Sequence, residues 1–273
     1  MALMEGFLDG FRWIRRFPVF LAPAFFGGII QGALLLFTWD FWQDFGISLS
    51  SGAFALPGNA LEVPVFSWLA FSEVWGPAIG ILGAGFLIEI GVLFVYAKMS
   101  AMVMQKKKPA LGTALNATLS HWTSVVAVAL FFSVIFVFFA WIIAVLAGLK
   151  GLLNGIGTIL AVLAFFAAVY VYVRSVFTAP ILAMHEKGLK EALNTSARFS
   201  SGRFWSIALF FGILAVGLQA VHGIGEVLGD PFLGENALAG VLVFDWIGRS
   251  YAFTALCMYY LNGVREARAR KRK

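Results

Sequence analysis

The chain has 273 residues, of which 61% are hydrophobic and only 12% are charged, and its formal net charge is +6. A soluble domain carries about 25% charged and about 45–50% apolar residues, so this composition excludes an ordinary soluble domain and predicts an all-α membrane protein. The single cysteine, Cys257, excludes an intramolecular disulfide. The basic residues flank apolar runs, which favours a membrane surface over nucleic acid as their partner.

Six apolar runs are long enough to cross the hydrocarbon core, for which a helix needs about 20 residues. They cover approximately residues 17–39, 75–98, 121–148, 151–180, 204–225 and 238–261. The first run follows three arginines, as in a signal peptide, but it is longer than the about 7–15 residues usual for a signal-peptide core. We therefore predict a polytopic protein with about six transmembrane helices in one domain, residues 1–273, with the first span retained.

An aromatic loop, residues 40–74, separates the first two predicted spans on the external side. It has many Trp and Phe residues and few charges, which predicts that it lies in the bilayer interface rather than in water. Two interpretations stay open: the loop caps an outward-facing cavity, or it is a connector that lies along the membrane.

When the six predicted spans alternate in direction, lysine and arginine concentrate on one side of the membrane. One side holds Arg12, Arg15, Arg16, Lys98, Lys106, Lys107, Lys108, Lys187, Lys190, Arg198, Arg203 and the tail 265–273. The other side holds Lys150 and otherwise acids, namely Asp40, Asp44, Glu62, Glu73, Glu226, Asp230 and Glu235. Because cytoplasmic segments are enriched in Lys and Arg, we predict a multi-pass protein of the cell membrane with both termini in the cytoplasm. The basic tail suits anionic lipid headgroups and this orientation equally.

Two cytoplasmic regions resemble each other in sequence. Three pairs of short segments match, namely 95–98 with 171–174, 114–116 with 192–194, and 129–132 with 208–211. Each unit contains a span, a cytoplasmic segment and a returning span, and both units start on the same side. The pattern predicts a parallel internal repeat, against the alternative of chance similarity between apolar segments. Amphipathic patterns at residues 3–17 and 188–199 further predict short cytoplasmic interfacial helices before spans one, three and five.

Around the second cytoplasmic region the chain resembles a known family. The segments that carry the resemblance are 177–181 (FTAPI), 187–196 (KGLKEALNTS) and 202–205 (GRFW). They are similar to the six-helix membrane domain fused to some glycerophosphodiester phosphodiesterases, and found in related stand-alone membrane proteins of unknown function. The resemblance implies a six-helix fold, a membrane location and, by association, an involvement with lipids. It implies no catalytic residues, because the phosphodiesterase domain is absent from this sequence.

Glu89 is the first candidate site residue, because it lies midway along the second predicted span. A charge at the centre of the bilayer costs about 2.5–3.5 kcal/mol on insertion scales. Glu89 is therefore either a proton, cation or substrate site, or a structural carboxylate bonded to a neighbouring helix. Asp245 and Arg249 lie four residues apart in the sixth span, a spacing that favours a local pair. The alternative is that Arg249 pairs with Glu89 or with an anionic headgroup.

Lys98 and Arg174 occupy matching positions in the repeat, near the cytoplasmic ends of spans two and four. Long basic side chains at such positions snorkel to the interface, and recognition of lipid phosphate is the alternative. No catalytic constellation, metal-ligand spacing or cofactor motif is recognisable, which predicts a non-enzymatic protein without metal or cofactor. The expected partners are membrane lipids, with anionic headgroups at the cytoplasmic face, or a protein partner in membrane organisation or assembly. The alternative function is a small transporter or channel that uses Glu89.

Overall fold

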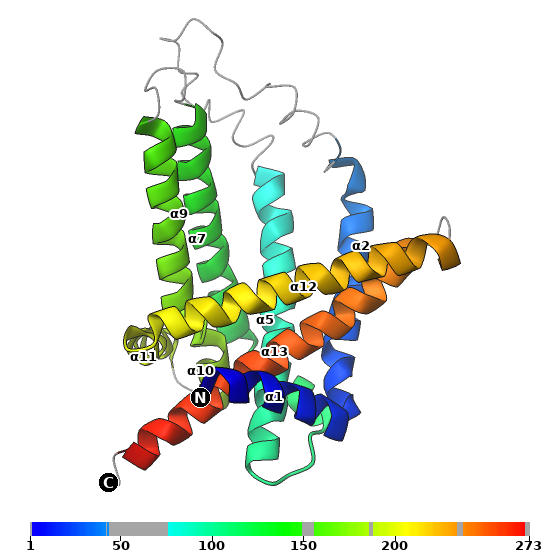
Figure 1. Cartoon of the computed structure of the whole chain (residues 1–273), viewed down its shortest axis with the longest axis vertical. Helices are drawn as coiled ribbons and strands as arrows, with labels where there is room; N and C mark the ends of the chain where they lie inside the picture. The colour runs from blue at the N-terminus through cyan, green and yellow to red at the C-terminus, as the bar shows by residue number, and fades with distance from the viewer. Residues whose placement is uncertain are drawn as a thin grey trace, which may run out of the picture. The chain divides into compact units, whose positions relative to one another are not determined.

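The computed structural model describes residues 2–41, 43, 76–148, 156–185, 188–233 and 237–270. In this part of the chain every regular element is a helix, and no strand occurs. The helices, in the order of the colours in Figure 1, are α1 (Ala2–Arg16), η1 (Pro18–Leu21), α2 (Ala22–Phe37), α5 (Gly76–Met104), α6 (Leu111–Ser120), α7 (Trp122–Gly148), α9 (Ile156–Ser175), α10 (Thr178–His185), α11 (Leu189–Ser201), α12 (Phe204–Leu233) and α13 (Ala237–Arg270). The predicted all-α class is confirmed.

Five helical segments among the described residues are long and apolar enough to cross a membrane. They are Pro18–Phe37, Ile79–Met104, Trp122–Phe139, Ile159–His185 and Phe204–Val221. Each overlaps one of the first five predicted spans, so the chain has the character of a multi-helix membrane protein. The predicted loop 40–74 lies outside the described residues beyond position 43.

The sixth predicted span, 238–261, falls within α13, which is not among these five segments. α13 has 34 residues and, at a rise of about 1.5 Å per residue, is long enough for a core of about 30 Å. Asp245 and Arg249 lie within the predicted span, and the helix continues past it through polar residues from Asn262 onward. A sixth span stays a prediction.

The described residues group into two compact units. One comprises Met1–Ile29, Glu89–Val128 and Val173–Lys273, and the other comprises Ile30–Ile88 and Ala129–Tyr172. In the second unit Phe86 packs against Phe136 with ring centroids 5.7 Å apart. Large apolar side chains of the same unit are exposed on α7 and α9, including Val134, Phe138, Leu163, Phe165 and Phe166. An apolar surface of this extent is expected where lipid covers a helix.

In the first unit, α13 packs lengthwise against both α12 and α1 (Figure 1). α1 approaches α13 through two glycines one helical turn apart. A Cβ atom added to Gly6 would lie 3.3 Å from Cβ of Tyr259, and one added to Gly10 would lie 3.1 Å from Cα of Ala255. Small residues four apart allow two helix backbones to approach closely, so the glycines hold α1 against α13.

The short helices α6 and α11 also bury small residues at four-residue spacing. In α6 these are Ala114 and Thr118, and in α11 they are Ala192, Ser196 and Ser200. The hydroxyl of Ser196 donates to the carbonyl of Arg174 at 2.8 Å, which fastens α11 to the end of α9. Each short helix therefore has a small, buried face, and each directly precedes a long apolar segment.

The helical hydrogen-bond ladder is interrupted between α1 and α2, where the 3-10 helix η1 starts at Pro18. Side chains from two other helices bind the carbonyl groups of this break. The Tyr96 hydroxyl of α5 donates to the carbonyl of Phe20 at 2.6 Å, and the Trp246 indole N–H of α13 donates to the carbonyl of Leu21. Buried backbone carbonyls need such partners, so these bonds stabilise the start of the first apolar segment.

An aromatic cluster forms the core of the first unit around Tyr259. The ring centroid of Tyr259 lies 5.9 Å from that of Phe177 and 4.9 Å from that of Phe210. Phe7 of α1 adds a ring 4.7 Å from Phe210. Phe7 belongs to α1, Phe210 to α12 and Tyr259 to α13, and Phe177 lies in the turn before α10, so the cluster joins these four parts of the unit.

Candidate functional site

Glu89 and Arg249 form an ion pair between α5 and α13. An Nη1–H of Arg249 donates to Oε1 of Glu89 over 2.6 Å. The side chain of Glu89 is 31% exposed and that of Arg249 is 38% exposed. Pairing of Arg249 with Glu89, one of the arrangements left open by the sequence, is therefore present in the structure.

The geometry of this pair makes it a short, charge-assisted hydrogen bond. Bonds of this kind are stronger than bonds between neutral groups, and pairing lowers the cost of placing each charge in an apolar segment. Glu89 lies in the candidate span Ile79–Met104, while Arg249 lies in the segment predicted as span six. The pair therefore ties these two segments together electrostatically.

The other candidate residues lie on α5, α9 and α13. Asp245 is half-buried, one helical turn before Arg249 on α13. Lys98 and Arg174 are half-buried near the ends of α5 and α9. The backbone of Arg174 is also occupied structurally, because its carbonyl accepts the bond from Ser196. Each of these three residues has a further interaction in the structure, and whether any of them recognises lipid phosphate stays a prediction.

Exposed basic side chains gather on and beside the short helices of the first unit. They are Arg12, Arg15 and Arg16 of α1, Lys106, Lys107 and Lys108 before α6, and Lys190 and Arg198 of α11. Large apolar side chains are exposed on the same helices or directly after them. Phe11 of α1 is 62% exposed, Leu119 of α6 is 66% exposed, and Trp205, which follows α11, is 82% exposed. Basic and apolar side chains together are typical of a helix that lies in a membrane interface.

Arg203 is a further basic residue, and its role is structural. Its guanidinium lies 5.0 Å from the centre of the Phe199 ring. It also donates to the carbonyl of Gly263 and to Glu266, each over 3.4 Å. A Cβ atom added to Gly263 would lie 2.6 Å from Cζ of Phe199, so only glycine leaves room for this contact between α11 and α13.

Sequence reasoning missed the residues that hold α1 and the start of α2 in place. Gly6 and Gly10 carry the small-xxx-small spacing that signals close helix packing, and this signal was available in the sequence. The polar side chains Tyr96 and Trp246 lie 76 and 225 residues from the carbonyls they bind. Pairings so distant leave no trace in the local sequence pattern.

Comparison with protein-family models, with curated proteins and with solved structures finds no match. The resemblance to the six-helix domain of glycerophosphodiester phosphodiesterases is therefore still a prediction. Within the described part of the chain, no group of three or more His, Cys, Asp or Glu residues is arranged to hold a metal ion.

Proposed function

We propose that this chain is a non-enzymatic, six-span membrane protein whose cytoplasmic face binds anionic lipid and so serves membrane organisation or assembly. In this proposal the short helices α1, α6 and α11 lie in the cytoplasmic interface, before spans one, three and five. The two sequence repeats, which start at α5 and α9, form a parallel repeat, and α13 supplies the sixth span. Both termini are then in the cytoplasm of a cell whose plasma membrane holds the protein.

One observation carries the proposal: the short helices have a small-residue face packed on the protein, and basic and apolar side chains are exposed on these helices or directly beside them. In α1, Gly6 and Gly10 lie against α13 while Phe11, Arg12 and Arg15 are exposed. An interfacial helix needs an apolar side for the acyl boundary and cations for anionic headgroups. Each Lys or Arg close to an anionic surface contributes about 1 kcal/mol of attraction.

The parallel repeat has structural support in the same helices. Ala114 and Thr118 of α6 occupy the positions that match Ala192 and Ser196 of α11, and both pairs are buried. Chance similarity between apolar segments does not require the matched small residues to be buried in both copies. Gly6 and Gly10 continue the pattern in α1, as expected for the half unit at the N-terminal end.

The experiment counts lipids bound to the purified full-length protein by native mass spectrometry in a mild nonionic detergent. Phosphatidylglycerol and phosphatidylethanolamine with identical acyl chains are offered in equal amounts. We expect preferential binding of the anionic lipid, a preference that falls with added salt. The variant with Arg12→Gln, Arg15→Gln and Arg16→Gln should lose part of it. Equal binding of both lipids, or co-purification of a stoichiometric protein in their place, would reject the lipid proposal, the second in favour of a protein partner.

A transporter or channel is the second candidate function, and the specific observation in its favour is the ion pair inside two apolar segments. A conducted proton or cation would have to exchange with Arg249 at Glu89. The same mass spectra test this idea, because a small molecule bound to the wild type and lost in Glu89→Gln would point to a transport site. Unchanged spectra in Glu89→Gln would leave the pair structural.

A further inference from the structure

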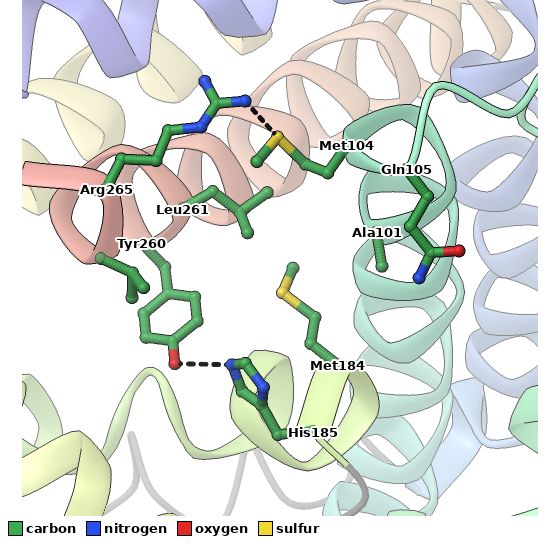
Figure 2. A pocket seen from close by; sticks show the side chains of 9 residues that line it. Ala101, Met104, Gln105, Met184, His185, Tyr260, Leu261 and Arg265 are labelled. Atoms are coloured by element: carbon green, nitrogen blue, oxygen red, sulfur yellow. Dashed lines mark hydrogen bonds between the residues drawn. The ribbon is translucent and has the colours of Figure 1, made fainter. Parts of the chain in front are cut away.

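A cavity lies between the C-terminal end of α5, the end of α10 and the C-terminal half of α13. Its volume is about 270 Å³, and Figure 2 shows the side chains around it. Most of its wall is apolar, formed by Ala101, Met104, Met184, Leu261 and Val264. Flexible methionine side chains adapt to ligands of varied shape. Because a water molecule takes about 30 Å³ of liquid volume, the cavity has room for a chain of several carbon atoms.

Polar groups stand on the remaining wall of the same cavity. The hydroxyl of Tyr260 and Nε2 of His185 are 3.1 Å apart and share a hydrogen bond (Figure 2). Arg265 is exposed, and its guanidinium donates to the thioether sulfur of Met104 over 2.8 Å. A thioether is a weak acceptor, and a guanidinium carries five N–H donors. The exposed guanidinium of Arg265, at the edge of the cavity, is therefore suited to bind a stronger acceptor, such as a phosphate or carboxylate.

We propose that this cavity is a binding site for an anionic lipid, with part of an acyl chain against Met104, Met184 and Leu261 and the anionic group at Arg265. The combination of an apolar wall with one exposed cation at its edge matches an amphiphile better than a fully polar anion. The inference rests on the cytoplasmic orientation proposed above, which places the ends of α5 and α13 at the headgroup level. It goes further by assigning one discrete site to one lipid molecule.

The test titrates the full-length protein in nonionic detergent with oleoyl lysophosphatidate, followed by native mass spectrometry. Oleoyl lysophosphatidylcholine supplies the same chain with a zwitterionic head, and inorganic phosphate supplies the anion without a chain. We expect one lysophosphatidate per chain with saturable binding, weaker binding of the zwitterionic lipid, and no competition by equimolar phosphate. Phosphate that displaces the lipid at equal concentration would overturn the proposal in favour of a free-anion site.

Two variants alter the site by different means. Arg265→Gln removes the cation and should weaken lysophosphatidate binding about tenfold, as expected for loss of a charged hydrogen bond, with a smaller effect on lysophosphatidylcholine, whose phosphate is balanced by the choline cation. Ala101→Leu keeps every charge but fills part of the cavity, and should weaken both lipids. Asn194→Ala changes one exposed polar side chain on α11 that does not line the cavity, and serves as the control.

The outcomes separate this inference from the proposed function. Lysophosphatidate binding that is unchanged in both Arg265→Gln and Ala101→Leu rejects the cavity site. Retained preference for phosphatidylglycerol in those two variants would then leave the interfacial helices as the lipid-binding elements. Conversely, if the triple arginine variant of α1 keeps its lipid preference while Arg265→Gln loses saturable binding, the cavity stands and the role of α1 in the proposed function fails.

Discussion

Breaking the Glu89–Arg249 pair should destabilise the protein more than loss of an ordinary surface ion pair. The two groups are 2.6 Å apart, and about two thirds of each side chain is covered. Two unit charges 4 Å apart attract by about 4 kcal/mol at an effective dielectric constant of 20. Water access reduces this value, while a charged hydrogen bond typically contributes about 1.5–3 kcal/mol. An arginine left alone at the centre of a membrane span costs about 2.5–3.5 kcal/mol.

We therefore expect Glu89→Gln to lower the free energy of unfolding by about 2–3 kcal/mol. In the double variant with Arg249→Gln the cost should be smaller than the sum of the two single costs, with a coupling energy of about 1.5–3 kcal/mol. The assay is reversible unfolding of the purified protein by sodium dodecyl sulfate in mixed micelles, followed by helical circular dichroism, for the complete double-mutant cycle.

A second cycle on Asp9 and Arg12 provides the control. These groups are 3.3 Å apart on one helix, and the arginine side chain is 71% exposed, so their coupling should stay below about 0.5 kcal/mol. If the costs of Glu89→Gln and Arg249→Gln are additive within about 0.5 kcal/mol, the ion pair contributes nothing to stability and the reasoning is refuted.

The remaining predictions use the same unfolding assay and concern close contacts. Gly263→Ala should destabilise the protein by about 1–3 kcal/mol because the added methyl group collides with Phe199. As a control, Gly212→Ala on an open helix surface should be neutral or stabilise the protein by up to about 1 kcal/mol. Equal effects of the two substitutions would contradict the packing around Gly263. Tyr96→Phe should cost about 1–3 kcal/mol because it leaves the buried carbonyl of Phe20 without its donor, and an unchanged midpoint would show that water replaces the hydroxyl. Gly10→Leu should release α1 from α13 and speed limited proteolysis in the first 16 residues; protection equal to the wild type would mean that α1 is held by other contacts.

Much of the helical fold follows from composition, because long charge-free runs have few alternatives to membrane-spanning helices. The first five predicted spans each overlap a candidate segment for this reason. The sixth predicted span contains Asp245 and Arg249 and stays a prediction. The break at η1 has a local signal in Pro18, yet the donors that stabilise it come from helices far along the chain.

The candidate site was less accessible to prediction than the fold. Helical spacing favoured a local Asp245–Arg249 pair and left pairing of Arg249 with Glu89 as an alternative, and in the structure Arg249 donates to this carboxylate, 160 positions away. Which distant helices meet depends on tertiary packing, and no local pattern encodes it. The cavity at Arg265 illustrates the same limit, because its walls come from three separate segments.

The most direct test of the proposed membrane topology is the accessibility of single cysteines to a membrane-impermeant maleimide in intact cells. Cys257 is buried and is replaced by alanine, and Glu5→Cys, Asp40→Cys and Arg265→Cys are compared, since all three native side chains are exposed. Six spans with cytoplasmic termini predict that only position 40 is labelled before the membrane is permeabilised, and that positions 5 and 265 are labelled afterwards. Labelling of position 265 from outside, with position 5 protected, would instead establish an odd number of spans and contradict the proposal.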